Sequence, residues 1–353
     1  MLRLQKLRIN KIMDKYSTRI MLNKDRIIYL DIARALTIFC VILGHVVDSN
    51  TSTKDLLYAF HMPAFFILSG IFCKDSVESV EEIKRFIRRR FHRLLIPYIV
   101  WGCIYSQFSF KNLLYICYGT RETLIRADSL TSLWFLPTLF VADIIVELMI
   151  YATSWLQKEA LEYVGTVLFL VIGFMMPHTK FGDPLGIDIA FVAASFMMTG
   201  HILRKVIFQK RIRLQKFGTV LILGLLGCVC LDTGIYFNNP SVGYVLMANA
   251  IYGNAGAFLL GALGGTAILL SLSIGIDCTL ERKNALIWIG QNTMGIFLVH
   301  KPFVELFRKF IGGLGFDYNC IPLTMFIALM SLALSCIVVQ IITMFMPALF
   351  GKD

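Results

Sequence analysis

The stretch YLDIARALTIFCVILGHVV, residues 29–47, has the length and hydrophobicity of a membrane-spanning helix but carries ionisable side chains inside it. Arg34 and His45 stand eleven positions apart, about three helical turns, so both side chains project within roughly 20° of one helix face and about 16 Å apart along the axis. A charged or titratable group in the hydrocarbon core is costly unless it faces a protein interior or a water-filled cavity. The stretch therefore predicts a membrane helix with a functional site.

The rest of the chain fits an all-α, polytopic membrane helix bundle. Hydrophobic residues make up 57% of the 353 positions and charged residues only 16%, and long apolar runs recur from end to end, which excludes a soluble globular core. We predict about ten transmembrane helices, at residues 28–47, 56–73, 94–110, 132–154, 161–177, 185–203, 217–237, 248–275, 285–303 and 321–347.

Two regions of different composition divide the chain. Residues 1–26 form a basic segment that alternates basic and apolar residues, as an amphipathic helix on a membrane surface does. Residues 27–349 form the membrane domain, and its first apolar segment leads into DSNTSTKD rather than into a small-residue cleavage site, so we expect it to remain as the first span.

The distribution of basic residues predicts the orientation. With the N-terminus in the cytoplasm, 25 of the 34 Lys and Arg residues fall in inside segments and eight in outside segments, with Arg34 in the membrane. This threefold bias follows the positive-inside rule and predicts that both termini are cytoplasmic. The formal net charge of +11 then lies mostly in loops that face anionic lipid, so no nucleic-acid partner is needed to explain it.

The nine cysteines stand singly in or near apolar segments, and only Cys228 and Cys230 lie close together. Their spacing matches no metal-ligand pattern and no disulfide framework. We therefore expect no metal site and no permanently bound cofactor.

The first span offers a catalytic constellation. Asp31 stands three residues before Arg34, within reach of it on one helix face. His45 is the natural general base for a hydroxyl group, because the ordinary pKa of histidine is about 6.5. We expect His45, Arg34 and Asp31 to be catalytic. The alternative is that Asp31 and Arg34 only neutralise each other near the inner interface while His45 caps the outer end of the helix.

The second predicted span opens with FHMPAFFILSG, residues 60–70. His61 lies just inside its outer end, at a depth similar to that of His45, which predicts that the two histidines share one site. An interfacial cap is the alternative for His61. Ser69 and Gly70 are small residues that let helices approach closely.

A basic run follows, KRFIRRRFHRLLIPY at residues 84–98, on the predicted cytoplasmic side. Guanidinium groups match phosphate oxygens in a bidentate fashion, so the run is suited to a phosphorylated cytosolic cofactor. The alternative is a topology signal that contacts anionic lipid. The candidates for phosphate binding are Arg88, Arg89, Arg90 and Arg93.

Other polar residues inside the predicted spans are candidates for the acceptor site or for a polar cavity. Trp134 is either an interfacial belt aromatic or a platform for a sugar ring. Asp143 and Glu147 share one helix face, so they share a proton, pair with an arginine of another helix, or line the cavity. His300 lies at the end of the ninth predicted span. It is either a site residue or a cap at the membrane interface.

Five segments together carry a resemblance to a known family. They are LDIARALTIFCVILGH with ten residues between Arg34 and His45, FHMPAFFILSG, RRRFHRLLIPY with the pair Arg90-x-x-Arg93, SLWFLPTLF, and IGQNTMGIFLVH. Their order over nearly the whole chain resembles acyltransferase family 3, the polytopic membrane O-acyltransferases, and the HMP form of the second segment is similar to the fucose 4-O-acetylase-like branch.

The resemblance implies an enzyme that moves an acetyl or other short acyl group from cytosolic acyl-CoA to a hydroxyl of a surface polysaccharide or its lipid-linked precursor. It also implies that Arg34 and His45 are essential, that Arg90 and Arg93 belong to the donor-binding motif, and that His300 matches the family's terminal histidine. We expect an integral protein of the bacterial inner membrane whose partners are acyl-CoA, a carbohydrate acceptor and membrane lipid. The resemblance does not decide whether the protein forms a homo-oligomer.

Two other classes of function compete with this reading. A transporter or flippase would also place charges inside a ten-span bundle, but its inverted repeats with paired broken helices are not evident in the sequence. A sensory or scaffold protein would tolerate changes at His45.

Overall fold

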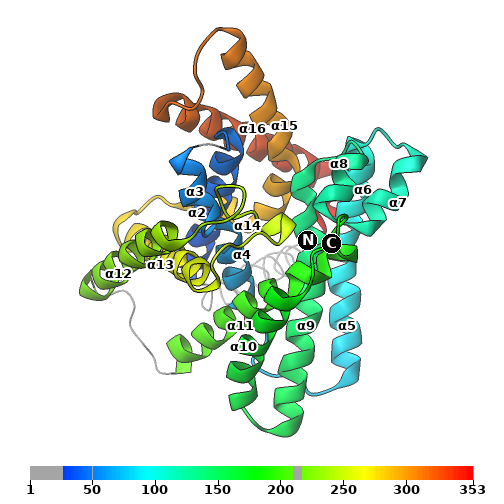
Figure 1. Cartoon of the computed structure of the whole chain (residues 1–353), viewed down its shortest axis with the longest axis vertical. Coiled ribbons are helices and arrows are strands. Elements are labelled where there is room, and N and C mark those ends of the chain that lie inside the picture. Colours follow the sequence, from blue (N-terminus) through cyan, green and yellow to red (C-terminus); the bar gives the residue numbers. More distant parts are fainter. Residues whose placement is uncertain (1–26, 50, 210–216, 353) are drawn as a thin grey trace, which may run out of the picture.

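The computed structural model describes residues 27–49, 51–209 and 217–352, and these residues form helices joined by short loops (Figure 1). The predicted N-terminal amphipathic segment, residues 1–26, lies outside the described residues. The α-helices are α2 (Ile28–Val46), α3 (Ser52–Tyr58), α4 (His61–Gly70), α5 (Val80–Arg90), α6 (Ile96–Tyr105), α7 (Phe110–Tyr118), α8 (Arg121–Arg126), α9 (Phe135–Leu156), α10 (Ala160–Met175), α11 (Ile187–Gln209), α12 (Phe217–Phe237), α13 (Ala255–Thr279), α14 (Asn284–Gln291), α15 (Thr293–Gly313) and α16 (Ile321–Phe345).

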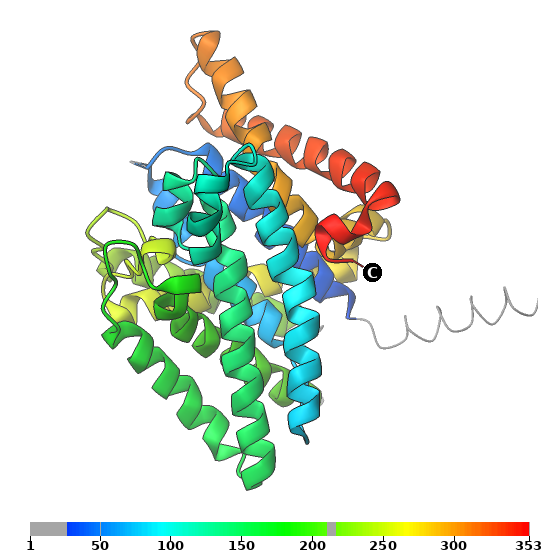
Figure 2. The ribbon, with the colours of Figure 1, turned by 90° about the vertical axis from the view of Figure 1, so that its right-hand side faces the viewer.

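Short helical turns link several of these helices. A π-helical turn, η1 (Phe91–Leu95), joins α5 to α6, and the 3₁₀ turn η2 (Thr131–Trp134) leads into α9. The other 3₁₀ turns are η3 (Pro184–Gly186), η4 (Met247–Asn249) and η5 (Pro347–Phe350). Figure 2 shows α5, η1 and α6 as one continuous helix that runs beside α9.

Helix α2 is the centre of the bundle, where it packs against α4, α13, α14, α15 and α16. Its residues Leu30, Ile38 and Ile42 are fully or almost fully buried, as expected for a helix that is apolar on most of its faces. Gly290 lets α14 approach α2 closely, because a Cβ at this position would collide with the backbone carbonyl of Asp31. The helix with the ionisable residues is thus surrounded by protein.

Glycines also set two other close helix contacts. A Cβ at Gly70 of α4 would collide with the carbonyl of Met197 in α11, and one at Gly200 would collide with the carbonyl of Ile67. Small residues at such crossings let backbones approach, which is the main route to tight helix packing in lipid. The predicted packing role of Gly70 is therefore confirmed.

Six helical segments of the described part are long and apolar enough to cross a membrane: Ile28–Val46, Thr131–Leu156, Pro184–Val206, Phe217–Phe237, Ala255–Thr279 and Ile321–Phe345. Helix α12 exposes Leu221, Ile222, Leu225 and Val229, which suits a lipid-facing surface rather than water. The prediction of an all-helical integral membrane protein is confirmed. The count of ten transmembrane helices and the cytoplasmic location of both termini are not confirmed, so both stay predictions.

Four predicted spans are not among these six, and two of the four are interrupted helices. The predicted span 56–73 is interrupted at Ala59 and Phe60, so it consists of α3 and the ten-residue α4. The predicted span 285–303 is interrupted at Asn292, between α14 and α15. Hydropathy averages over a window and does not register a local change of backbone direction.

A half-buried polar cluster holds the loop before α11. His178 Nδ1 pairs with the carboxylate of Asp188, in the first turn of α11, and its Nε2 lies 3.8 Å from Glu122 of α8. Asn249 Nδ2 also contacts Glu122. Hydrogen bonds to Asp188 and then to Glu122 raise the pKa of His178 to about 9, so the imidazole is protonated at neutral pH.

Candidate functional site

A cavity of about 270 Å³ lies at the carboxyl-terminal end of α2, and we call it the His45 cavity. His45 of α2, His61 of α4 and Trp134 of η2 all line it. Its other walls come from α3, α8, α15 and the segment 244–248. Three side chains that the sequence singles out in separate motifs therefore meet at one place.

His61 owes its position to the break between α3 and α4. It is the first residue of α4, and Pro63 stands in the same first turn, where backbone N–H groups have no intrahelical partner. Its Nδ1 lies 2.6 Å from the carbonyl oxygen of Leu57. A carbonyl only accepts, so Nδ1 carries the proton and Nε2 of the neutral ring keeps its lone pair.

His300 lies against His45. The two ring centroids are 5.3 Å apart with an interplanar angle of 40°, and His300 is fully buried, so it is not an interfacial cap. Its Nδ1 donates to the carbonyl of Phe297 at 2.8 Å, whereas its buried Nε2 has no hydrogen-bond partner among the residues that the structure describes. The predicted terminal histidine therefore packs against His45 from α15, although it does not itself line the His45 cavity.

Trp134 and Ser132 belong to the 3₁₀ turn that precedes α9. Trp134 is 7% exposed and forms part of the cavity wall, so it is not a belt aromatic at the lipid surface. Ser132 also lines the cavity, and its buried hydroxyl has no hydrogen-bond partner within the described residues. Such a hydroxyl costs about 1–3 kcal/mol unless water or a ligand bonds to it.

Lys54 is a buried cation at the wall of the His45 cavity. Its Nζ donates to the carbonyls of Gly44 at 2.7 Å and Val47 at 3.4 Å, at the end of α2. The ammonium also lies 4.3 Å from the ring centroid of Tyr58. Burial, followed by the charge of Arg308, lowers the pKa of Lys54 to about 8. The lysine thus caps the helix that carries His45.

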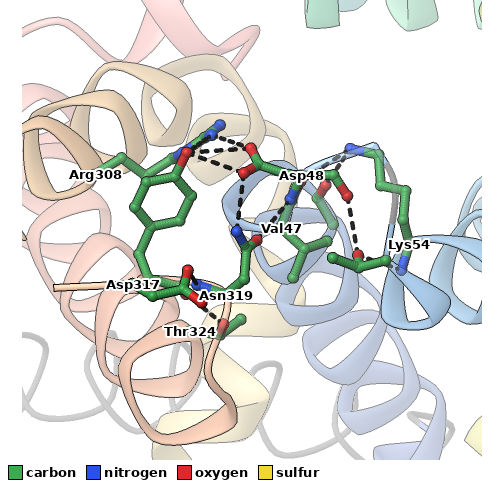
Figure 3. Close-up of polar contacts among 10 residues, drawn as sticks. Val47, Asp48, Lys54, Arg308, Asp317, Asn319 and Thr324 are labelled. Atoms are coloured by element: carbon green, nitrogen blue, oxygen red, sulfur yellow. Dashed lines mark hydrogen bonds and ion pairs between the residues drawn. The ribbon is translucent and has the colours of Figure 1, made fainter. Parts of the chain in front are cut away.

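Asp48 anchors the chain directly after α2 (Figure 3). Its carboxylate accepts bonds from Arg308, from Asn319 Nδ2 at 2.9 Å and from the Tyr318 hydroxyl at 3.1 Å. Burial raises the pKa of Asp48, but the bonds from Asn319 and Tyr318 and the charge of Arg308 outweigh it, so the pKa falls below its ordinary value. This ionised cluster ties α2 to α15 and to the loop before α16.

A second cavity of about 360 Å³ includes Arg34, and we call it the Arg34 cavity. Its lining includes one acidic side chain, Asp143, and five cationic ones: Arg34, Lys74, Arg89, Arg90 and Arg93. The Arg34 guanidinium carbon lies 3.8 Å from the centroid of the Phe72 ring, which orients it by a cation–π contact. So dense a group of guanidinium groups favours a ligand with several anionic oxygens.

The carboxylates expected in this region differ in role. Asp143 of α9 is 1% exposed, and its Oδ2 lies 3.1 Å from Nε of Arg90. Two of the three alternatives predicted for Asp143 therefore hold: it pairs with an arginine of another helix, and it lines the cavity. Glu147, one turn further along α9, is also buried, but it does not line the Arg34 cavity.

Four predicted site residues line neither cavity: Arg88, Asp31, Glu147 and His300. Arg88 is exposed on α5 and does not line the Arg34 cavity. Asp31 is buried in the first turn of α2, where its backbone contacts Gly290, and it lines neither cavity. The structure therefore narrows the candidate arginines to Arg89, Arg90 and Arg93.

The two cavities lie at different levels of α2. Arg34 lines one and His45 lines the other, so the two side chains that project from one helix face reach two separate cavities. Helix α2 is nevertheless the common wall, and its side chains face an anion-binding environment and an imidazole cluster about three turns apart. The arrangement can hold an anionic molecule at one level and accept a proton at the other.

Sequence reasoning misses several residues of the His45 cavity. Lys54 and Arg121 come from short, polar segments that contain no recognisable pattern, and only the fold brings them to the cavity. Ser132 and Lys301 stand next to predicted site residues, in SLW and in HKP. Their position beside Trp134 and His300 is the only feature of the sequence that indicates a place in the site.

The comparisons with known proteins agree with this geometry. No curated protein matches the chain. A family model described as an acyltransferase domain, Acyl_transf_3, matches residues 27–340, a range that includes every lining residue of both cavities. The chain therefore belongs to acyltransferase family 3 and is an integral membrane acyltransferase.

Proposed function

We propose that the protein is an O-acyltransferase that moves an acetyl or other short acyl group from acyl-CoA to a hydroxyl of a surface polysaccharide or its lipid-linked precursor. One observation carries the proposal: α2 presents Arg34 to a cavity rich in guanidinium groups and His45 to a cavity that His61 also lines, with the ring of His300 packed against His45. This pairing of an anion site with a base is what transfer from a phosphorylated donor to a hydroxyl requires.

The Arg34 cavity is the proposed donor site. Arg89, Arg90 and Arg93 bind the phosphates of acyl-CoA, since guanidinium groups bond phosphate oxygens in a bidentate fashion. The pantetheine arm then runs along α2, past Arg34, toward His45. The cationic lining of the cavity supports this assignment.

His45 is the proposed general base. It takes the proton of the acceptor hydroxyl, the oxygen attacks the thioester carbonyl carbon, a C–O bond forms and the C–S bond breaks. The CoA thiolate leaves and takes up a proton, so His45 returns to its neutral state. The alternative chemistry is a transient acyl group on His45 itself, which then passes to the hydroxyl. We prefer the direct attack.

We further propose that the donor site faces the cytoplasm of a bacterial cell and that the chain belongs to the fucose 4-O-acetylase-like branch. The excess of basic residues in the predicted inside segments supports the orientation, because Arg89, Arg90 and Arg93 belong to one of them. The HMP sequence at residues 61–63 supports the branch.

The test is mass analysis of surface glycans from cells with and without the protein, combined with CoA release by the purified chain in nanodiscs. We expect an acetyl group to be lost from the glycan in the cells without it, and thiol release from acetyl-CoA only when the acceptor is present. Unchanged glycans together with acyl-CoA-independent movement of a glycan across the membrane would instead establish the transporter alternative.

A further inference from the structure

The His45 cavity carries an excess of positive charge that acyl transfer to a neutral sugar does not need. Its lining contains four cationic side chains, Lys54, Arg121, Lys301 and Arg308, and two acidic ones, Asp48 and Glu305. Charged groups beside a desolvated cavity are costly to maintain, so an excess of one sign favours a ligand of the opposite sign.

Two of the four cations are committed to the protein. Arg308 forms an ion pair with Asp48, and the Lys54 ammonium donates to backbone carbonyls at the end of α2. Arg121 and Lys301 are different, because neither forms an ion pair with a carboxylate of the described residues. Within the described part of the chain, Lys301 Nζ donates only to the Thr131 hydroxyl, at 2.7 Å.

A second observation also indicates a ligand. The hydroxyl of Ser132 lines the same cavity, in a residue that is 4% exposed, and it has no hydrogen-bond partner in the described part of the chain. Ser132 follows Thr131, the partner of Lys301, so an oxygen-rich ligand held by Lys301 lies within reach of this hydroxyl as well.

The remaining walls suit a sugar ring. Trp134, Tyr58 and Tyr244 line the cavity, and aromatic faces provide apolar surface beside polar groups. A volume of about 270 Å³ is close to the lower end of ligand pockets, roughly 300 Å³, so the cavity accommodates one substituted ring rather than an oligosaccharide.

We propose that the His45 cavity binds an anionic acceptor, a sugar that bears a carboxylate or a phosphate, with its anionic group on Arg121 and Lys301 and its ring against Trp134. The proposal rests on the proposed function for what happens to the sugar hydroxyl at His45. The anion site itself is independent of transfer, because it requires only binding.

Direct binding tests the proposal without any catalytic step. The full chain in nanodiscs of uncharged lipid is titrated with methyl glucuronide, glucose 1-phosphate and methyl glucoside, and ligand-observed NMR gives each dissociation constant. We expect at least one charged probe to bind tenfold or more tightly than the neutral glucoside. Tighter binding of the glucuronide identifies a carboxylated sugar, and tighter binding of glucose 1-phosphate identifies a sugar phosphate; either result supports the proposal.

Variants assign the site. Arg121→Gln and Lys301→Gln should each weaken binding of the preferred anion about tenfold and leave binding of methyl glucoside and of CoA unchanged. Lys309→Gln is the matched control, because Lys309 is an exposed lysine on the same helix as Lys301 and lies outside the cavity lining. Melting temperatures of all variants report whether folding is intact.

Two outcomes overturn the proposal. Equal affinity for the neutral and both charged probes removes the anion site. Weakened CoA binding in Arg121→Gln or Lys301→Gln assigns these cations to the donor instead. If the proposed function is wrong but the anion site exists, the protein binds the anionic sugar and transfers no acyl group. This result differs from both outcomes above.

Discussion

Lys54 donates a 2.7 Å hydrogen bond from Nζ to the carbonyl oxygen of Gly44, the residue that precedes His45. The lysine lies on α3, ten residues further along the chain, and it satisfies carbonyls that have no partner at the end of α2. A cation at this end of a helix also complements the helix dipole. The backbone that positions the proposed base is therefore held by a side chain from another helix.

The first prediction concerns this cap. Lys54→Met removes the donor but keeps most of the apolar stem, so we expect the free energy of unfolding to fall by about 1–2 kcal/mol. Because His45 adjoins the cap, we also expect kcat to fall while the donor KM is unchanged. Thermal unfolding and steady-state kinetics measure the two effects. Lys111→Met, at an exposed lysine of α7, is the control. If the two variants had the same stability and the same kcat, the Lys54 cap would contribute to neither.

The second prediction concerns the proposed base. His45→Ala should reduce acyl transfer by a factor of at least about 100, the usual contribution of a general base, while expression and membrane insertion remain normal. CoA release by the purified variant is the measurement. His92→Ala, at an exposed histidine outside both cavities, should retain full activity. Full activity in His45→Ala would exclude this residue from the mechanism.

The third prediction separates the arginines of the basic run. Arg93→Ala should raise the KM for acyl-CoA about tenfold, because a lost charge-assisted bond weakens the ground state and the transition state alike. Arg93→Lys should restore only part of the loss, since it keeps the charge without the planar fork. Arg88→Ala is the matched control and should have no effect, because Arg88 does not line the Arg34 cavity. If all three variants gave the same KM, the run would be a topology signal only.

The fourth prediction concerns the pair of Arg90 and Asp143. Arg90→Ala leaves a carboxylate that is 1% exposed without its partner, so we expect a loss of about 1–3 kcal/mol in stability in addition to any effect on KM. Asp143→Asn in the same chain removes the uncompensated charge and should restore most of the stability, although not the KM. Unfolding curves and donor kinetics of both variants test this. No recovery of stability in the double variant would contradict the role of the ion pair.

The fifth prediction is a pH dependence that comes from His178. Its pKa is raised from 6.5 to about 9 by Asp188 and Glu122, so the folded protein binds the proton more tightly than the unfolded chain does. This contribution to stability is complete below about pH 6.5 and is lost as the pH rises through 9. The melting temperature should therefore fall over that range in the wild-type protein, and less so in His178→Gln. An identical pH profile in the two proteins would show that the cluster does not control stability there.

Local patterns in the sequence were enough for the features that depend on helix geometry and composition. Apolar runs predicted an all-helical membrane protein, because the hydrocarbon core admits few other backbone structures. The spacing of Arg34 and His45, together with the Arg90-x-x-Arg93 pair, identified the family, which the match over residues 27–340 confirms. The predicted phosphate-binding role of these arginines stays a prediction.

Only the tertiary structure decided which side chains meet. Helical periodicity alone did not separate Arg88 from Arg90, since the choice depends on where α9 places Asp143. Hydropathy also missed the break at Phe60 that makes His61 the first residue of α4.

The His45 cavity shows the same limit most clearly. Lys54, Arg121, Ser132 and Lys301 come from segments far apart in the chain, and no short-range pattern joins them. Sequence determined which chemistry each helix can carry, because that depends on residues one or a few turns apart. Structure decided the composition of the site, because a cavity in a helix bundle is built from contacts between residues distant in sequence.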